Sequence, residues 1–203
     1  MIDATPQGRL LMEMLNSAWA LLRHGAAHSG DPFNRPVIGT GCGDGCHLRT
    51  VILRQVDETR RLLTCFSDIR SVKIGEIHDW AYTQWLFYHP RRKIQLRIGG
   101  PAVVHSDDGV AAACWQRVKG LSRLNYCADL PPGTPVERPS SGLPRRLTQD
   151  LPKLLAGDAG RANFAVIETF AEYIDWLRLK PSGNLRAQFR WVANNWQASW
   201  AVP

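Results

Sequence analysis

The sequence predicts a mainly β protein with attached helices, in which antiparallel strands form a small barrel. From residue 37 onward, short runs rich in Val, Ile, Leu and Thr alternate with tight turn signals, which is typical of strands joined by hairpins. Ahead of these runs, one N-terminal segment has apolar residues at helical spacing. The 203 residues, 44% of them hydrophobic, can bury one sizeable core, so we expect a single domain over residues 1–203.

The N-terminal helix is predicted to begin at Thr5 and Pro6, where a capping hydroxyl precedes a proline suited to the first turn. Apolar residues then recur every three or four positions, at Leu10, Leu11, Met14, Leu15, Ala18, Trp19 and Leu22. We expect the helix to end near Gly25, so that the helix and the loop after it take up residues 1–30.

The first predicted strands are VIGTGC, HLRTVILRQV and RLLTCF, which are separated by GDG and DETR. Residues 67–79 predict a turn and a short helix, and strands return in AYTQWLFYH and KIQLRIGGPAVVH. The last strands lie in NFAVIETFAEYIDWLRL and NLRAQFRWVANNWQASWAVP. Within the final segment, Asn194 and Asn195 suit the two-residue turn of a hairpin.

Two further segments are predicted as insertions among the strands. Ser106, Asp107 and Asp108 place a capping hydroxyl and two acids before the run VAAACWQRV, which predicts a helix. The proline-rich stretch from residue 128 to 144 predicts a long surface loop. PRRLTQDLPKLLAG after it predicts a further helix, which Pro152 would interrupt, so loop and helix form an insertion over residues 128–160.

Cys42, Cys46 and His47 in GTGCGDGCHLRT raise the question of a metal or haem site. Haem attachment requires two residues between the cysteines, and here there are three. A structural zinc site needs a fourth ligand, normally from a second pair, and the other three cysteines stand alone in the sequence. Asp44 and Gly45 between two β-type runs are a strong hairpin signal, so we expect a turn, reduced thiols and no metal.

The net charge of +7 and the pI near 9.5 favour anionic partners, among them nucleic acid, acidic lipid and phosphate-bearing small molecules. Nucleic acid is disfavoured because the basic residues are dispersed and are not interleaved with aromatic residues on one strand face. No apolar run approaches the roughly 18 residues of a membrane span, and the N-terminus lacks the regions of a signal peptide. We therefore expect a soluble cytoplasmic protein with no membrane partner.

The residues after the predicted hairpin carry a resemblance to a known family. RTVILRQVDETRRLLTCFSDIRSVKIGEI contains, in order, an Arg-x-Val-x-Leu-Arg-type strand, an acidic turn, an aromatic strand ending Phe-Ser, and a helix start with serine and lysine. YTQWLFYHPRRKIQLRIGG and IDWLRLKPSGNLRAQF continue the match, which covers roughly residues 35–203. The sequence resembles the pyridoxamine 5'-phosphate oxidase family and its FMN-binding split-barrel relatives.

The resemblance implies a six-stranded antiparallel split β-barrel with an N-terminal helix and inserted helices. It also implies a homodimer with FMN at the subunit interface, to which both subunits contribute. The implied cofactor contacts are Arg49, Thr50, Val51, Ile52, Leu53, Arg54, Phe66, Ser67, Ser71, Lys73, Gln95, Trp176 and Arg186. Arginine forks, a lysine at a helix N-terminus and hydroxyls suit the FMN phosphate, and a glutamine and an indole suit the flavin ring.

The sequence departs from the true oxidase at positions that bind phosphate and substrate. Val72 stands where the oxidase has an arginine, so one phosphate-binding cation is missing. Ser182 and Asn184 stand where the oxidase has the arginine and histidine that hold its pyridoxal substrate. The candidate substrate contacts are therefore Arg54, Arg117, Ser122 and Arg123, together with Ser182 and Asn184 at the altered positions.

The function implied is that of an FMN-binding oxidoreductase, in which a hydride passes between a small substrate and the flavin. None of the six histidines falls at a matched position, so no catalytic residue is assigned. The true pyridoxamine or pyridoxine 5'-phosphate oxidase and a non-catalytic flavin-binding protein are the alternatives. The residues leave open whether FMN, another flavin or haem is bound.

Overall fold

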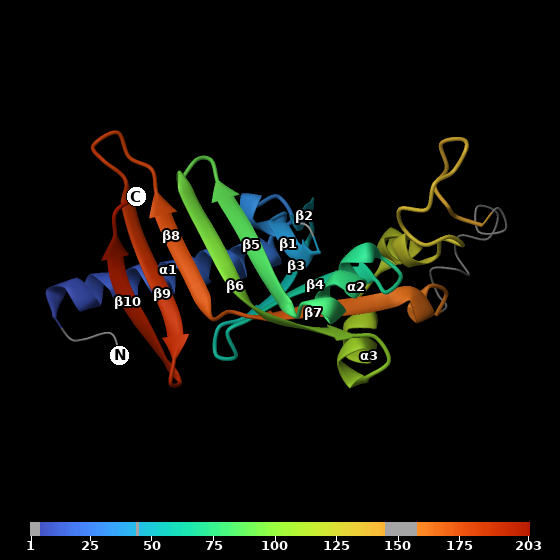
Figure 1. Cartoon of the computed structure of the whole chain (residues 1–203), viewed down its shortest axis with the longest axis horizontal. Coiled ribbons are helices and arrows are strands. Elements are labelled where there is room, and N and C mark those ends of the chain that lie inside the picture. Colours follow the sequence, from blue (N-terminus) through green and yellow to red (C-terminus); the bar gives the residue numbers. More distant parts are fainter. Residues whose placement is uncertain (1–4, 44, 145–157) are drawn as a thin grey trace.

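The computed structural model describes residues 5–43, 45–144 and 158–203, and Figure 1 shows the order of the elements along the chain. The α-helices are α1 (Pro6–Ala27), α2 (Val72–Asp79) and α3 (Gly109–Trp115), and the 3-10 helices are η1 (Pro32–Asn34), η2 (Gly120–Tyr126) and η3 (Arg161–Asn163). The strands are β1 (Val37–Cys42), β2 (Gly45–Thr50), β3 (Leu53–Asp57), β4 (Leu62–Asp68), β5 (Tyr82–His89), β6 (Ile94–His105), β7 (Phe164–Phe170), β8 (Tyr173–Arg178), β9 (Leu185–Val192) and β10 (Asn195–Ala201).

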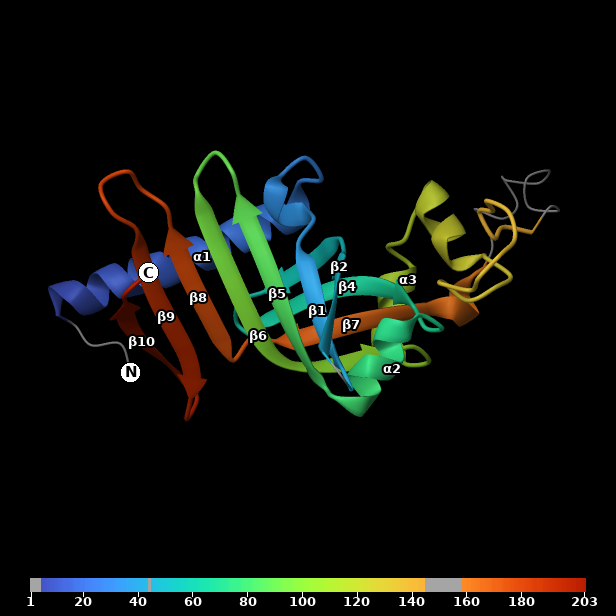
Figure 2. The ribbon, with the colours of Figure 1, turned by 45° about the horizontal axis from the view of Figure 1, so that its top comes forward.

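All the strand pairs are antiparallel, and the strands divide into two groups that share β6. The large sheet has the order β10-β9-β8-β6-β5-β1-β2, and the small sheet consists of β3, β4 and β7. The first part of β6 pairs with β8, and residues 102–105 pair with β7 instead. Figure 2 shows β6 bending from the large sheet towards the small one. The predicted mainly β fold with an antiparallel split sheet is confirmed, although the described residues contain ten strands where six were expected.

The run HLRTVILRQV, predicted as one strand, forms two. β2 pairs with β1 and ends at Thr50, whereas β3 pairs with β4 and begins at Leu53. Between them the Val51 N–H donates to the Pro36 carbonyl over 2.9 Å, so the chain leaves one sheet before it enters the other. Consecutive strands with different partners keep the sheet from closing. The break lies within the stretch that carries the candidate cofactor contacts.

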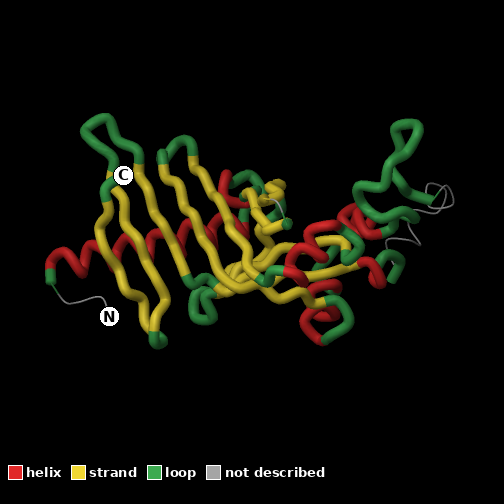
Figure 3. The backbone as a smooth tube through the Cα atoms, in the orientation of Figure 1, coloured by secondary structure: helices red, strands yellow, loops and turns green. Residues whose placement is uncertain are grey.

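α1 covers one face of the large sheet, and it is the long helix behind β8, β9 and β10 in Figures 1 and 3. Its predicted start is confirmed, because the Thr5 hydroxyl accepts from the Gly8 N–H over 3.1 Å. The helix continues to Ala27, slightly beyond the predicted end. Its buried side chains, with Trp19 and Leu22 among them, join the main core beneath the sheet. Among the described residues, no helix is long and apolar enough to span a membrane.

A second, smaller core lies between the small sheet and the connection from α3 to η2. Trp115, Tyr126 and Phe164 pack together there, with ring centroids 5.0 to 5.9 Å apart, and the Tyr126 ring meets both of the others edge to face. The predicted cap of α3 is confirmed, since the Asp108 carboxylate accepts from the Ala111 N–H over 2.9 Å. Residues 128–144 form the predicted surface loop, whereas the helix expected after it falls on residues 145–157, outside the described residues.

The C-terminal hairpin is confirmed, but its turn lies one residue earlier than predicted. Ala193 and Asn194 occupy the two turn positions, with φ values of 47° and 60°, and Asn195 is already the first residue of β10. Two consecutive positive φ values are typical of the type I′ turn, whose twist matches that of the strands it joins. The register of β9 with β10 therefore places Ala193 at a turn position that more often holds asparagine or glycine.

Candidate functional site

The residues predicted to bind phosphate meet at the start of α2. The Lys73 ammonium donates to the hydroxyls of Ser67, at 3.1 Å, and Ser71, at 2.9 Å, and these hydroxyls lie 3.0 Å apart. Ser71 precedes the helix, yet its side chain makes no capping hydrogen bond to it. We call Ser67, Ser71 and Lys73 the lysine cluster. It is a set of donors at a helix N-terminus, the kind of place where proteins bind phosphate.

Arg49 lies near the lysine cluster but is already paired with a carboxylate. Its guanidinium donates to Glu76 over 3.1 Å and also to the Thr40 hydroxyl. Glu76 accepts in addition from Thr40 and contacts the His47 ring. Burial raises the pKa of Glu76, but these donors outweigh burial and hold the pKa below its ordinary value. Burial and the neighbouring Arg49 charge lower the pKa of Lys73, so the two cations lie close enough to repel each other.

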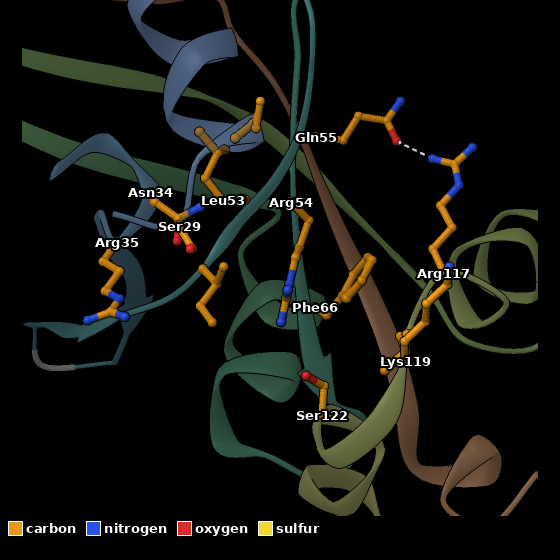
Figure 4. Close-up of a pocket in the computed structure, with 14 residues that line it drawn as sticks. Ser29, Asn34, Arg35, Leu53, Arg54, Gln55, Phe66, Arg117, Lys119 and Ser122 are labelled. Atoms are coloured by element: carbon orange, nitrogen blue, oxygen red, sulfur yellow. Dashed lines mark hydrogen bonds between the residues drawn. The ribbon is translucent and has the colours of Figure 1, made fainter. Parts of the chain in front are cut away.

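A pocket of about 500 Å³ lies beside this region, between the end of α1, strands β3 and β4, and the segment that joins α3 to η2 (Figure 4). We call it the central pocket. The structure brings together in its wall two groups of residues predicted separately, the cofactor contacts Ile52, Leu53, Arg54 and Phe66 and the substrate contacts Arg117 and Ser122.

Arg54 and Phe66 lie next to each other in the wall of the central pocket. The Arg54 guanidinium carbon lies 5.3 Å from the centroid of the Phe66 ring, and Figure 4 shows the two side chains next to each other. Burial raises the pKa of the Cys65 thiol to about 12, while the nearby charges of Lys73 and Arg54 act to lower it. Phe66 lines the pocket and the next residue of β4, Ser67, belongs to the lysine cluster, so the cluster and the pocket lie side by side.

Four cations line the central pocket, Arg35, Arg54, Arg117 and Lys119. No carboxylate from the described part of the chain forms an ion pair with any of them, and the Arg117 guanidinium donates to the neutral Gln55 amide oxygen, over 3.0 Å. Arginines elsewhere in the chain, such as Arg49 and Arg186, do have carboxylate partners. The pocket is consequently a place where an anion would relieve repulsion between like charges.

Gln95 and Arg186 lie away from the lysine cluster, on the face of the large sheet opposite α1. Gln95 of β6 pairs with Leu177 of β8, which pairs in turn with Arg186 of β9. Side chains at directly paired positions point to the same face of a sheet, so Gln95 and Arg186 flank Leu177. Within one chain, these two candidate contacts form a separate group.

Arg186 is held by Asp175, a residue that the sequence analysis did not single out. Its Nε and Nη2 atoms donate to the Asp175 carboxylate, with the shortest distance 2.7 Å, and Arg97 donates to the same carboxylate. Tyr173 and Gln188 add donors at 2.7 and 3.3 Å. Burial raises the pKa of Asp175, but the hydrogen bonds from Arg186, Tyr173 and Arg97 outweigh burial and hold the pKa well below its ordinary value.

The lowered pKa of Asp175 predicts a loss of stability in acid. Because its folded-state pKa lies below its unfolded-state pKa, the stabilisation is complete above the unfolded value near 4 and is lost as the pH falls through the folded value. We expect Asp175→Asn to cost about 2 kcal/mol of unfolding free energy at neutral pH. Urea titrations across the acid range should show this difference shrinking below about pH 4; a difference independent of pH would contradict the assignment.

Trp176 is a core residue. It is 2% exposed, on the face of the large sheet that α1 covers, and its indole N–H finds no hydrogen-bond partner among the residues that the structure describes. It therefore lies on the opposite side of β8 from Asp175. Ser182 and Asn184 lie in the exposed loop between β8 and β9, where the Asn184 side chain accepts from the Lys180 N–H over 3.1 Å. Neither residue is near the central pocket in the same chain.

The remaining candidates have local structural roles. Thr50 is exposed at the end of β2, and Val51 is partly buried at the break before β3. Arg123 donates to the Val118 carbonyl over 2.9 Å and stacks on Trp115, 5.0 Å from its ring centroid, so it supports the segment behind the pocket wall.

The β1–β2 hairpin places Cys42 and Cys46 on strands that pair with each other, and none of the five cysteines, all of which lie in the described part of the chain, forms a disulfide bond. Among the described residues, no group of three or more His, Cys, Asp or Glu side chains is arranged to hold a metal ion. The hairpin predicted around Asp44 and Gly45 is confirmed from its two strands, although Asp44 itself lies outside the described residues.

The sequence analysis missed four residues: Arg35 and Lys119 in the wall of the central pocket, Glu76 beside Arg49, and Asp175 on the open face of the large sheet. Asp175 lies between apolar neighbours in YIDWL, which could have marked it as a buried carboxylate that needs partners, whereas the mixed segment VKIGEIHD gives no such signal for Glu76. Arg35 and Lys119 lie in irregular segments, and nothing in their local sequence indicates a shared pocket.

Comparison with known proteins supports the resemblance. Residues 27–106 match the family model for the pyridoxamine 5'-phosphate oxidase FMN-binding domain. This range includes the lysine cluster, Arg54 and Gln95, and it ends before Arg117 and the C-terminal strands. No curated protein matches the sequence significantly.

Two solved structures are similar over nearly the whole chain. One is a pyridoxamine 5'-phosphate oxidase-related, FMN binding protein from Nostoc punctiforme PCC 73102, with a TM-score of 0.75 and 21% identity, covering 92% of this chain and 96% of that one. The other is PhzG from Burkholderia lata 383 in complex with tetrahydrophenazine-1-carboxylic acid, with a TM-score of 0.69 and 16% identity, covering 96% and 91%. At these identities the likeness shows the fold. The resemblance to pyridoxamine 5'-phosphate oxidase-related proteins is thus confirmed, by sequence over residues 27–106 and by fold beyond them.

Proposed function

We propose that the protein binds FMN and acts as an oxidoreductase on a small anionic substrate, because its residues 27–106 match an FMN-binding domain. The lysine cluster beside the cation-lined central pocket is the observation that carries this proposal. Bound FMN would supply hydride transfer, a reaction that protein side chains cannot perform by themselves.

The donor chemistry of the lysine cluster fits a phosphate. Lys73 offers a partly buried ammonium whose partners are two hydroxyls and no carboxylate, and Ser67 and Ser71 offer further donors. Burial disfavours the charged form of Lys73, and a phosphate bound there would offset this by stabilising the positive charge. Arg49 would add a second positive charge from its position between Thr40 and Glu76. The segment from Thr50 to Arg54 would lie along the ring, with Phe66 beside it.

The four cations of the central pocket favour a substrate that carries a carboxylate or a phosphate. Phe66, Ile52 and Val118 provide apolar wall next to these charges, which suits a molecule with a flat apolar body and an anionic group. Ser122 adds a hydroxyl. The protein's part in the reaction would be to orient this substrate and to exclude water.

The protein would act as a homodimer. Gln95 and Arg186 form a group on the open face of the large sheet, away from the lysine cluster of the same chain. The resemblance implies that both subunits contact one flavin, and a second copy would supply such a group to the first copy's cofactor. Ser182 and Asn184, in the loop after β8, would approach the substrate in the same way.

The first experiment is a visible absorbance spectrum of the purified protein, recorded before and after incubation with FMN and desalting. Flavin bands that remain with the protein support the proposal, and their absence after desalting contradicts it. Anaerobic reduction of the bound flavin by candidate substrates then separates an oxidoreductase from a protein that only binds flavin. Oxygen uptake with pyridoxamine 5'-phosphate tests the true oxidase reaction.

The pocket charges predict that Arg54→Ala weakens anion binding to the FMN-loaded protein by about 1.5 to 3 kcal/mol, the scale of one hydrogen bond to a charged group. Benzoate titrated against the flavin absorbance provides the measurement, and uncharged benzamide should show no such loss. Arg9→Ala, on the exposed face of α1, removes the same charge far from the pocket and serves as the control. Equal loss for both ligands would show that Arg54 does not recognise the anionic group.

A further inference from the structure

Asp175 combines two features that normally exclude each other: it lies on the face of the sheet that α1 leaves uncovered, yet it is 2% exposed. The side chains that cover it are its own hydrogen-bond donors, Arg97, Arg186, Tyr173 and Gln188. A carboxylate buried in this way holds its partners in place, because leaving it unpaired would cost several kcal/mol. The arginines therefore have fixed positions on an otherwise open surface.

The geometry at Arg186 is a fork. Its Nε lies 3.1 Å from one carboxylate oxygen and its Nη2 lies 2.7 Å from the other, which defines the plane of the guanidinium. The third nitrogen, Nη1, reaches only the Val202 carbonyl, at 3.4 Å. Arg186 remains 25% exposed and Arg97 46% exposed, so both guanidiniums have edges towards solvent. Two guanidiniums on one carboxylate leave one positive charge in excess.

This charged group adjoins a candidate flavin contact. Arg97 of β6 is two residues from Gln95 and points to the same face, and Gln95 is separated from Arg186 only by Leu177 in the register. The residues that the resemblance implies at the flavin and the residues that hold Asp175 thus form one continuous surface.

We propose that Asp175 is a positioning residue for cofactor binding, which fixes the Arg186 guanidinium in the orientation that contacts FMN. This inference rests on the proposed FMN function and deepens it. Asp175 itself need not touch the flavin, since its effect passes through the fork to Arg186. Preorganisation of this kind raises affinity because the side chain does not have to be ordered when the ligand arrives.

The sign of the Asp175→Asn effect on FMN affinity tests the proposal. The substitution removes a negative charge near an anionic ligand, so electrostatics alone would tighten FMN binding. Positioning predicts the opposite, a dissociation constant about tenfold higher in fluorescence titrations of the purified dimer. Tyr173→Phe is the matched control, because it removes one donor to Asp175 and leaves the fork to Arg186, and it should change the affinity by less than about threefold.

A double-mutant cycle separates positioning from a general structural effect. If Asp175 acts through Arg186, then Asp175→Asn should cause no further loss in an Arg186→Ala background. Arg186→Lys, which keeps the charge but cannot form the fork, should bind FMN as weakly as Arg186→Ala, and this variant tests the idea even if Asp175→Asn fails to fold.

Additive losses in the cycle, unchanged or tighter binding by Asp175→Asn, or wild-type affinity in Arg186→Lys would each overturn the inference. Wild-type protein that does not bind FMN would instead overturn the proposed function, and this inference with it. The FMN titration of the wild-type protein distinguishes the two failures, because it shows no binding only if the proposed function is wrong.

Discussion

Lys73→Ala should weaken FMN binding by about 1.5 to 3 kcal/mol, the contribution of a charge-assisted hydrogen bond from a partly buried donor. Lys73 is the one member of the lysine cluster with a full charge, and its partners in the chain are the neutral hydroxyls of Ser67 and Ser71. Arg49 cannot replace it, since Glu76 and Thr40 already hold the Arg49 guanidinium. Equilibrium titration of FMN against the purified variant measures the effect.

The control for this prediction is Arg9→Ala, which removes a positive charge from the exposed face of α1, away from the lysine cluster. It should leave FMN affinity unchanged within about 0.5 kcal/mol. Arg49→Ala should weaken FMN binding by an intermediate amount, because Glu76 already pairs with the Arg49 guanidinium. It should also lower the stability of the fold, because the buried Glu76 carboxylate loses that partner. Wild-type affinity in Lys73→Ala would show that the phosphate does not bind at the start of α2.

Gly100→Ala should destabilise the fold by about 3 kcal/mol or more, the upper range of overpacking by a single methyl group. A Cβ atom at Gly100 would lie 1.8 Å from the Phe170 carbonyl oxygen, which belongs to the backbone and cannot rotate away. Gly100 lies where β6 passes from the large sheet to the small one, and there the Glu172 N–H donates to the Gly99 carbonyl over 2.9 Å. Thermal and urea unfolding of the variant give the measurement.

Gly75→Ala is the control for Gly100→Ala. Gly75 lies inside α2, and a Cβ atom there would meet nothing within 4 Å. Alanine has a higher helix propensity than glycine, by up to about 1 kcal/mol, so this variant should be as stable as the wild type or more stable. If Gly100→Ala proved equally stable, the close approach of the β7–β8 connection to β6 would be wrong.

Most elements could be predicted from the sequence because their signals are local. The Thr5 and Asp108 caps, the hairpin strands around residues 43 and 44, and the alternating burial of β5 follow from neighbouring residues alone. Ser67, Ser71 and Lys73, which the sequence analysis assigned to cofactor binding, are in contact because they lie within seven residues of one another around a turn, and their role at a phosphate stays a prediction.

What sequence reasoning missed depends on partners that are distant in the chain. The break between β2 and β3 arises because two consecutive strands pair with different sheets, and HLRTVILRQV contains no proline or glycine that would mark it. The shift of the C-terminal turn to Ala193 follows from the register of β9 with β10. A register is decided by which faces are buried, and that is a property of the assembled sheet.

By itself, the sequence determined a mainly β chain with an N-terminal helix, and a lysine and two serines gathered around one helix start. Only the tertiary structure decided which charges are paired. It gave carboxylate partners to Arg49 and Arg186, and within residues 5–43, 45–144 and 158–203 it left Arg54 and Arg117 without one at a shared pocket. The physical reason is that an ion pair depends on distance in space, and residues such as Arg97 and Asp175, 78 positions apart in the chain, meet only when β6 and β8 pair.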